Sequence, residues 1–417
     1  MTRIKVDDKA AFQTGISRRL KTKSGDPIKD FAKYFFADLS ISDINQREWE
    51  NVLASLRSSW KFYKGFRGAK SQIRIVPSEG NLLVIEIASI NLPFLLDSIR
   101  LELKRLDLVL ADVQQCLMGV VRSSRKVVIS DAVEINESLI RLEIESSGVP
   151  ENLGDCITEV IEIVRQVVED FSPMRKQLLL WSDDSTFKVN QGETYELLRW
   201  FYANNFTFLG YEEHKTDKSG KLRLLPRSRM GLSRPGMSAD GMPLTVPDGV
   251  LNIEKLPIKS RVHRPAYLDS ITICERKGKK IISACRFVGL FTSTVYNYNP
   301  IKIPLVRQKI ANIFSESDVI PSSHKGREIS RIIEVLPREE LFFADSDDLQ
   351  QLVTKIFAMQ ERRLVRVLLR QDNYFANCII YVPKDTYDTE LRIQIQDELA
   401  STFDASELEF VTYFSES

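Results

Sequence analysis

Cysteine and histidine are scarce in this sequence, and their scarcity excludes two kinds of site. The five cysteines are at positions 116, 156, 274, 285 and 378. Their number is odd and none forms a Cys-x-x-Cys pair, so we expect reduced thiols and no disulfide framework. The three histidines, His214, His263 and His324, have no histidine or cysteine at helix or hairpin spacing. A zinc site is therefore not expected.

Long apolar runs and an excess of one charge are also missing. No stretch approaches the ~20 apolar residues that a bilayer requires, and the amino terminus has no apolar signal segment. The net charge is +1, from 58 basic and 57 acidic residues. That balance removes the main electrostatic argument for binding nucleic acid. We expect a cytoplasmic protein with no membrane and no nucleic-acid partner.

The glycine motifs of nucleotide and hydrolase sites do not occur. No Gly-x-Gly-x-x-Gly follows a strand, and neither a phosphate loop nor a Gly-x-Ser-x-Gly elbow is found. Gly231, Gly236 and Gly241 lie five apart in a polar stretch, Arg227–Asp248, that is typical of a long loop. The sequence therefore predicts no catalytic residues, no metal and no cofactor of its own.

The most informative segment that is present runs from Ile90 to Ile99, directly after the apolar strand Leu82–Ala88. Asn91 is predicted as the helix N-cap, Pro93 fits the first turn, and Asp97 suits the positive end of the helix dipole. Unpaired backbone N–H groups at such a turn can hold the carboxylate of a small ligand. We predict a ligand-binding turn formed by Asn91, Leu92, Pro93, Phe94, Leu95 and Asp97. The alternative is a turn that only covers the end of a sheet.

The elements around this turn follow a known order. Leu95, Ile99, Leu103 and Leu106 form the apolar side of a helix, and Glu102 falls on its charged side. The apolar segment Leu108–Val121, the alternating strand Ser138–Glu145 and an amphipathic helix from Cys156 to Val167 come next. Strand, helix, strand, strand, helix is the order of a ferredoxin-like split βαβ unit, which ACT domains resemble. The preceding Gln72–Val76 predicts an extra edge strand.

A second candidate site lies in Arg261-Val-His-Arg-Pro-Ala-Tyr267. The three cations Arg261, His263 and Arg264 beside a tyrosine predict a contact for an anionic ligand. The alternative is that His263 only hydrogen-bonds the backbone ahead of a strand.

At 417 residues the chain has room for about two to four domains. An antiparallel, PAS-like sheet is expected from Phe206–Tyr211 and the hairpin Tyr267–Glu275 with Lys280–Phe291. Helices are expected over 303–314 and 346–362, bridged by 326–337, and the last fifty residues read strand, strand, helix, strand. The fold class is α+β, with several ferredoxin-like, ACT-like βαββαβ modules. The expected parts are a flexible arm (1–24) and helical prelude to residue 70, an ACT-like module at 71–185, a PAS-like or second ACT-like antiparallel sheet domain at 186–300, connecting helices at 301–362, and a partial, truncated ACT-like module at 363–417.

Several ordered strings together resemble one family. They are Ala32-Lys-Tyr-Phe, Leu92-Pro-Phe-Leu-Leu-Asp-Ser98, Phe206-Thr-Phe-Leu-Gly-Tyr211, Val262-His-Arg-Pro-Ala-Tyr-Leu-Asp269, Arg286-Phe-Val-Gly-Leu-Phe-Thr-Ser293, Ile303-Pro-Leu-Val-Arg-Gln-Lys309, Leu336-Pro-Arg-Glu-Glu-Leu341 and Tyr381-Val-Pro-Lys-Asp-Thr-Tyr-Asp-Thr-Glu-Leu391. Each string is weak alone, but the set resembles the amino-terminal part of the very large bacterial NAD-dependent glutamate dehydrogenases from about residue 26 onward.

The resemblance implies a regulatory region of an enzyme that oxidises L-glutamate to 2-oxoglutarate and ammonium. NAD would be the cofactor of the parent enzyme, whose catalytic domain lies downstream and is absent here, and the enzyme would be a homo-oligomer. Two hypotheses follow. The region either senses an amino-acid effector at the Asn91–Asp97 turn, or it is a homo-oligomerisation scaffold with no small ligand. Phe94 stands where ACT domains usually have a glycine, which favours the scaffold.

Overall fold

The computed structural model describes residues 3–21, 26–68, 70–78, 80–123, 126–182, 192–317, 319–359 and 365–413. The expected domain boundary at 185/186, the start of the last module at 363 and the chain end from residue 414 lie outside these ranges. The chain divides into two compact units: Met1–Asp170 with Ser260–Ala266, and Phe171–Lys259 with Tyr267–Ser417. Both combine helices with antiparallel sheets, so the α+β class is confirmed.

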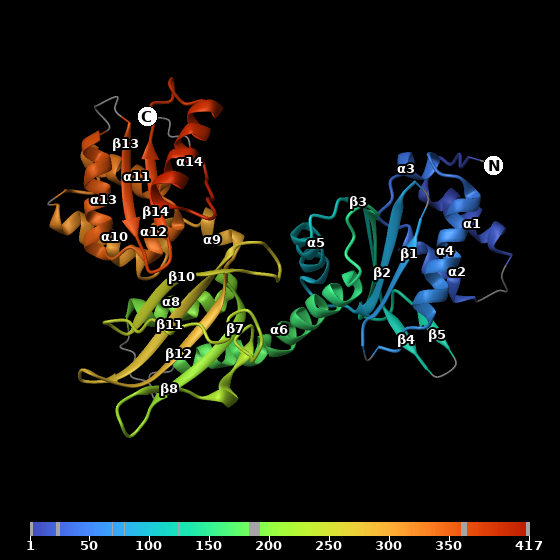
Figure 1. Cartoon of the computed structure of the whole chain (residues 1–417), viewed down its shortest axis with the longest axis horizontal. Helices are drawn as coiled ribbons and strands as arrows, with labels where there is room; N and C mark the ends of the chain where they lie inside the picture. The colour runs from blue at the N-terminus through green and yellow to red at the C-terminus, as the bar shows by residue number, and fades with distance from the viewer. Residues whose placement is uncertain are drawn as a thin grey trace. The chain divides into compact units, whose positions relative to one another are not determined.

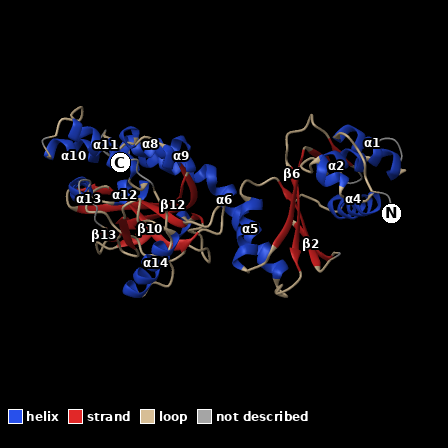
Figure 2. Ribbon diagram, turned by 90° about the horizontal axis from the view of Figure 1, so that it is seen from above, coloured by secondary structure: helices blue, strands red, loops and turns tan. Residues whose placement is uncertain are grey.

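The first unit has three layers, with helices on both faces of a four-stranded sheet (Figures 1 and 2). Its elements are α1 (Lys9–Leu20), α2 (Pro27–Phe35), α3 (Ile41–Asn45), α4 (Trp49–Lys64), β1 (Gln72–Pro77), β2 (Leu82–Ile90), α5 (Leu95–Arg105), β3 (Leu110–Met118), β4 (Val120–Arg122), β5 (Val127–Ile129), β6 (Glu137–Glu145) and α6 (Leu153–Ser182), which runs on into the second unit.

The sheet order is β1-β2-β6-β3, and all neighbours are antiparallel. The predicted order of strand, helix, strand, strand, helix is confirmed, and so is the extra edge strand at Gln72–Val76. In a βαββαβ module the last strand pairs with the first. Here β1, which comes earliest in the chain, holds that edge position beside β2, so the module reads ββαββα.

The amino-terminal helices cover one face of this sheet, and the prediction of a flexible arm is wrong for residues 9–20. Asp8 caps α1 by accepting a hydrogen bond from the Ala11 N–H (2.7 Å). Phe12, Ile16 and Leu20 are buried in one core with α2, α4 and the sheet residues Ala88 and Leu139. Only three apolar residues spaced four apart mark α1 in the sequence, which is why its burial was not predicted.

Two buried glutamates lie on the sheet strands β2 and β6 of the first unit. Glu86 on β2 accepts hydrogen bonds from Ser59 and from Arg74 Nε (2.8 Å). Glu137 on β6 accepts from the Tyr63 hydroxyl (2.5 Å) and from Arg122 Nε (2.7 Å). Burial, reinforced by Glu137, raises the pKa of Tyr63 above its ordinary value. Each buried carboxylate is therefore paired, as its desolvation requires.

The second unit is built on a larger antiparallel sheet in the order β10-β11-β12-β7-β8, with β9 also pairing with β7. Its elements are α8 (Glu193–Trp200), a π-helical turn (Phe201–Asn205), β7 (Phe206–Thr216), β8 (Leu222–Leu224), a 3-10 turn (Pro226–Ser228), β9 (Met230–Gly231), β10 (Leu251–Lys259), β11 (Tyr267–Lys277), β12 (Lys280–Phe291), α9 (Ser293–Asn297), a 3-10 turn (Pro300–Lys302), α10 (Val306–Glu316), α11 (His324–Val335), α12 (Arg338–Phe343), α13 (Ser346–Met359), β13 (Arg366–Gln371), β14 (Ala376–Tyr381) and α14 (Thr389–Phe403).

The hairpin at 267–291 was expected to pair with strands at 206–212 and 221–225. Its pairing with the first is confirmed, whereas the second, β8, pairs with β7 and not with the hairpin. β10 was missed because Lys255 and Pro257 interrupt its alternation. The long loop after β8 is fixed by the fully buried Arg286. Its guanidinium pairs with Glu212 (2.7 Å) and donates to the Met242 and Pro243 carbonyl oxygens. The three glycines of this loop have positive φ angles, as turn glycines do.

Helices α6, α8 and α10 to α13 share one buried apolar core with the strands β7, β10, β11 and β12. The stretch 326–337, predicted as a bridge, instead forms most of α11, because Ser323 caps it and Ile329, Ile332 and Ile333 give it a buried side. Lys309 on α10 is buried, and its ammonium donates to the carbonyl oxygens of Leu341, Phe342 and Ala344 at 2.6–3.1 Å. It thereby satisfies carbonyl groups at the end of α12.

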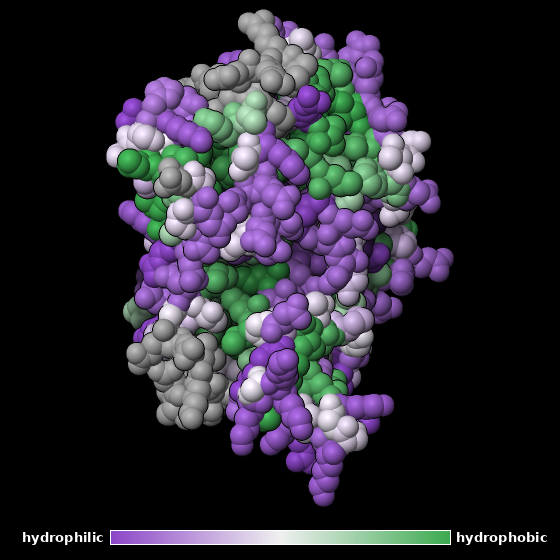
Figure 3. All heavy atoms as spheres, turned by 90° about the vertical axis from the view of Figure 1, so that its left-hand side faces the viewer, coloured by the Kyte–Doolittle hydropathy of each residue, from purple (hydrophilic) through white to green (hydrophobic). Residues whose placement is uncertain are grey.

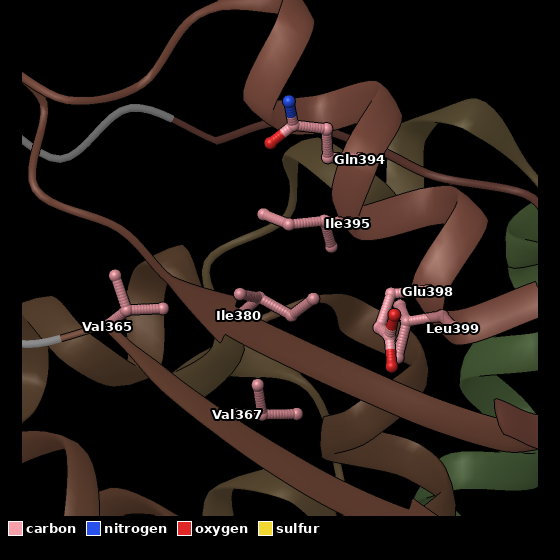
Figure 4. Close-up of a pocket in the computed structure, with 7 residues that line it drawn as sticks. All are labelled: Val365, Val367, Ile380, Gln394, Ile395, Glu398 and Leu399. Atoms are coloured by element: carbon pink, nitrogen blue, oxygen red, sulfur yellow. The ribbon is translucent and has the colours of Figure 1, made fainter.

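The carboxy-terminal elements are a hairpin, β13–β14, and helix α14. An open groove of about 330 Å³ lies between them (Figure 4), lined by Val365, Val367, Ile380, Gln394, Ile395, Glu398 and Leu399. The expected last strand from residue 409 is wrong for residues 409–413, which have no pairing partner and are irregular. The face drawn in Figure 3 shows hydrophobic patches between hydrophilic side chains.

Lys309 yields a test of this packing. Burial lowers its pKa from 10.5 to about 8, so unfolding takes up a proton between these values and the stability of the second unit should rise as pH increases from 8 to 10.5. Lys309→Met should lose this pH dependence and about 2 kcal/mol at pH 7, because three carbonyl groups lose their donor. Urea unfolding followed by the fluorescence of Trp181 and Trp200 measures both. The exposed Lys302→Met is the control and should behave as wild type; a Lys309→Met variant that keeps the pH dependence would contradict the assignment.

Candidate regulatory site

The turn predicted as a ligand site leads from β2 into α5, but the helix begins later than expected. Phe94, not Asn91, is its N-cap, with a left-handed φ of 66° and no side-chain cap. The Asn91 N–H donates to the Asn136 carbonyl oxygen (2.9 Å), which continues the pairing of β2 with β6. The first helical carbonyl is that of Phe94, which accepts from both the N–H and the Oγ of Ser98. The N-cap and first-turn assignments of Asn91 and Pro93 are therefore wrong, whereas Asp97 does lie in the first turn.

The predicted turn residues divide by burial. Leu92 and Leu95 are buried and contribute to the module's own core. Asn91, Pro93 and Asp97 are exposed, and Phe94 is half-buried. A positive φ is the conformation that glycine adopts without cost, and here a phenylalanine adopts it.

Residues Ser260–Ala266 join β10 to β11, yet they belong to the first unit. The segment is held by its own bonds: Ser260 N–H to the Ala266 carbonyl (2.9 Å), Ser260 Oγ to the Val262 carbonyl (2.7 Å), and Arg264 N–H to that same carbonyl (3.0 Å). His263 lies between these bonds with a φ of 72°. Two left-handed residues, Phe94 and His263, therefore meet at this site.

His263 lies directly on the turn. Its backbone N–H donates to Ser98 Oγ (3.1 Å), and its ring packs against that of Phe94 with centroids 4.7 Å apart and planes at 46°. Its Nδ1 is 3.7 Å from an Asp97 carboxylate oxygen. The two candidate sites of the sequence analysis therefore form one site, and the turn is covered by the chain itself.

Arg261 fixes the same segment to both helices of the module. It donates to Glu159 on α6 (2.6 Å) and to Glu102 on α5 (3.3 Å). Glu102 is buried, contrary to its predicted place on a charged face. Arg105 also donates two hydrogen bonds to its carboxylate. Burial acts to raise the pKa of Glu102, but the bonds from Arg105 and Arg261 outweigh it and lower that pKa.

Sequence reasoning missed Ser98, Glu102 and Glu159 as members of this site. Ser98 is the one with a local signal, because it stands four residues after Phe94 at the spacing of a helical hydrogen bond. Glu159 and Glu102 are recognisable only once their partner Arg261 has been placed.

Within the described ranges, no group of three histidine, cysteine, aspartate or glutamate side chains could hold a metal ion. Among the helices that the structure describes, none is long and apolar enough to cross a membrane.

Comparisons with known proteins identify the family of this chain. Three models of glutamate dehydrogenase parts match in order: the ACT1 domain at residues 31–159, helical motif 1 at 303–362 and the ACT2 domain at 366–417. An NAD-specific glutamate dehydrogenase of Pseudomonas aeruginosa is 35% identical over 99% of this chain. The chain belongs to this family.

The other relatives place the chain as part of a larger protein. The NAD-specific glutamate dehydrogenase of Halomonas elongata is 29% identical over 96% of this chain, and that of Mycobacterium tuberculosis is 30% identical over 53%. The chain spans 28% of the length of the Pseudomonas and Halomonas enzymes. It corresponds to an amino-terminal region of these glutamate dehydrogenases that contains their ACT-type regulatory domains and not their catalytic part. The ACT1 match includes α3, α4 and α2 from residue 31 onward, so these parts belong to the module that the family shares.

The left-handed cap gives a direct prediction. Phe94→Ala and Phe94→Gly both remove the ring contact with His263, but only glycine accepts a φ of 66° without a Cβ penalty. The glycine variant should therefore be more stable than the alanine variant by about 1 kcal/mol. Urea unfolding followed by Trp49 and Trp60 measures the difference. At the exposed helical position Lys104 the same pair should show the opposite sign, and equal stabilities at position 94 would refute the assigned strain.

Proposed function

We propose that this chain is the non-catalytic regulatory and assembly region of an NAD-dependent glutamate dehydrogenase. The complete polypeptide would convert L-glutamate, NAD and water to 2-oxoglutarate, ammonium and NADH, with NAD bound in the downstream catalytic domain. A cytoplasmic, homo-oligomeric enzyme accords with this proposal. The ordered matches to ACT1, helical motif 1 and ACT2 support it.

One observation favours a structural role for the Asn91–Asp97 turn over an open effector pocket. The place beside Phe94, Asp97 and Ser98 is filled by His263 of the same chain. Helices also cover both faces of the four-stranded sheet β1-β2-β6-β3, the ACT1 sheet. Subunit pairing through this sheet would therefore use the outer edges of β1 and β3. In this proposal the turn is an internal docking point and the region acts as a scaffold.

Amino-acid sensing is the second candidate, and a specific feature favours it. The N-terminus of α5 has no side-chain cap, and the exposed Asp97 carboxylate lies in its first turn. An amino acid offers a carboxylate for the free N–H groups and an ammonium group for Asp97.

Thermal unfolding of the chain distinguishes the two. A ligand at a hundred times its dissociation constant adds about 2.7 kcal/mol to the folded state. The docking proposal predicts no shift with 2-oxoglutarate, NAD or any amino acid that lacks an imidazole ring, followed through Trp49 and Trp60. A shift with one amino acid that disappears in Asp97→Ala, but persists in Asp155→Ala at the start of α6, would instead establish sensing.

The parent activity has its own test. The complete polypeptide should reduce NAD when L-glutamate is supplied, and this chain alone should not. Absorbance of NADH records the rate. A complete polypeptide that acts on another substrate and leaves L-glutamate untouched would refute the assignment.

A further inference from the structure

We propose that Ser260–Ala266 is a detachable internal ligand of the Asn91–Asp97 turn. The His263 ring then occupies a receptor site for an imidazole-type ring with an N–H donor. The inference rests on the proposed regulatory role only for its biological use. Its physical basis is the set of contacts around Phe94, Asp97 and Ser98 within the first unit.

The segment can keep its shape when it leaves the turn. Its bonds from Ser260 to Ala266 and from Arg264 to Val262 join residues of the segment to each other. A peptide closed on itself in this way loses little order on release, so it can behave as a preorganised ligand. Exposure of the buried Val262 side chain opposes release.

The charges also permit release. Removing one partner of a buried ion pair is costly when it leaves a charge unpaired. Glu102, the buried carboxylate that holds Arg261, keeps two bonds to Arg105, at 3.0 and 2.6 Å. Glu159, the other partner of Arg261, has a side chain that is 59% exposed and is solvated when free. Neither carboxylate is left buried without a partner.

The surface that receives His263 defines the chemistry of a competing ligand. The Phe94 ring offers the His263 ring an aromatic face, and the Asp97 carboxylate favours a cation. Ser98 Oγ holds the backbone of the segment instead, because it accepts from the His263 backbone N–H. A flat ring that carries N–H donors and accepts a proton meets both requirements of the ring's place. Imidazole is the smallest probe of this class.

The segment is the loop that joins β10 to β11, so its release would change the conformational freedom of that loop. Occupation of the turn by such a ring and attachment of the segment exclude each other, because both use the Phe94 ring and the Asp97 carboxylate. A ligand that binds only the uncovered turn shifts the population towards the released state.

Trypsin cleavage measures release in the whole chain. The Arg261–Val262 bond lies in the segment, whereas the bond after Arg264 precedes Pro265 and is resistant. Detachment predicts cleavage at Arg261 through local opening, at a rate that barely changes with low urea concentrations and far exceeds the rate that global unfolding permits. Cleavage that follows the urea dependence of global unfolding would overturn the proposal.

A substituted chain tests the receptor site. His263→Gly removes the ring and suits the φ of 72°, so the variant should fold and be cut at Arg261 about tenfold faster, the size of one aromatic contact. In the His263→Gly variant, millimolar imidazole should bind in the vacated place and shift the Phe94 ring resonances in NMR spectra. The control variant His324→Ala keeps the His263 ring, so imidazole should leave its Phe94 resonances unchanged. The absence of a shift in His263→Gly would overturn the receptor site. These readouts are independent of glutamate turnover, so their failure differs from failure of the proposed function.

Discussion

Phe94 is held with a left-handed backbone, and much of the first unit follows from it. That conformation turns the chain that follows β2, makes the Phe94 carbonyl the first acceptor of α5 and places the Phe94 ring against that of His263. Ser98 stabilises the arrangement by bonding the same carbonyl, and its Oγ then accepts the His263 N–H. A glycine would permit the same turn but would offer no ring against which a distant segment could pack.

The elements with strong periodicity were predictable from sequence, and the failures have physical causes. β2, α5 and β6 have apolar residues at the expected spacing, and they formed. α1 and α11 were missed because their buried sides are short and a neighbouring helix or sheet supplies the rest of the core. At the site, the sequence predicted the Asn91–Asp97 turn and the Arg261–Arg264 group as separate sites, but it did not predict that they are in contact. Ser98 and His263 lie 165 residues apart, and no local pattern specifies such a contact.

The two-sided covering of the ACT1 sheet sets a second constraint. An antiparallel sheet can leave one face in water, but here helices bury both faces and any polar group between them must be satisfied internally. Glu86 and Glu137 meet this requirement with arginine and hydroxyl partners. Such paired carboxylates fix how α4 lies on the sheet, because each partner reaches only one position.

The placement of β1 at the edge beside β2 also bears on how the module folds. In a βαββαβ order the last strand pairs with the first, and the rest of the module lies between them in the sequence. A long loop must therefore close before that pair forms. In the ββαββα order the same edge is made by a hairpin whose strands are separated by a short turn. Loop closure is then cheap and the contact order is low, conditions associated with fast folding. During synthesis the β1–β2 hairpin and α5 leave the ribosome after α1 to α4 but before β3 and β6, so they can form a template on which β3 and β6 later assemble.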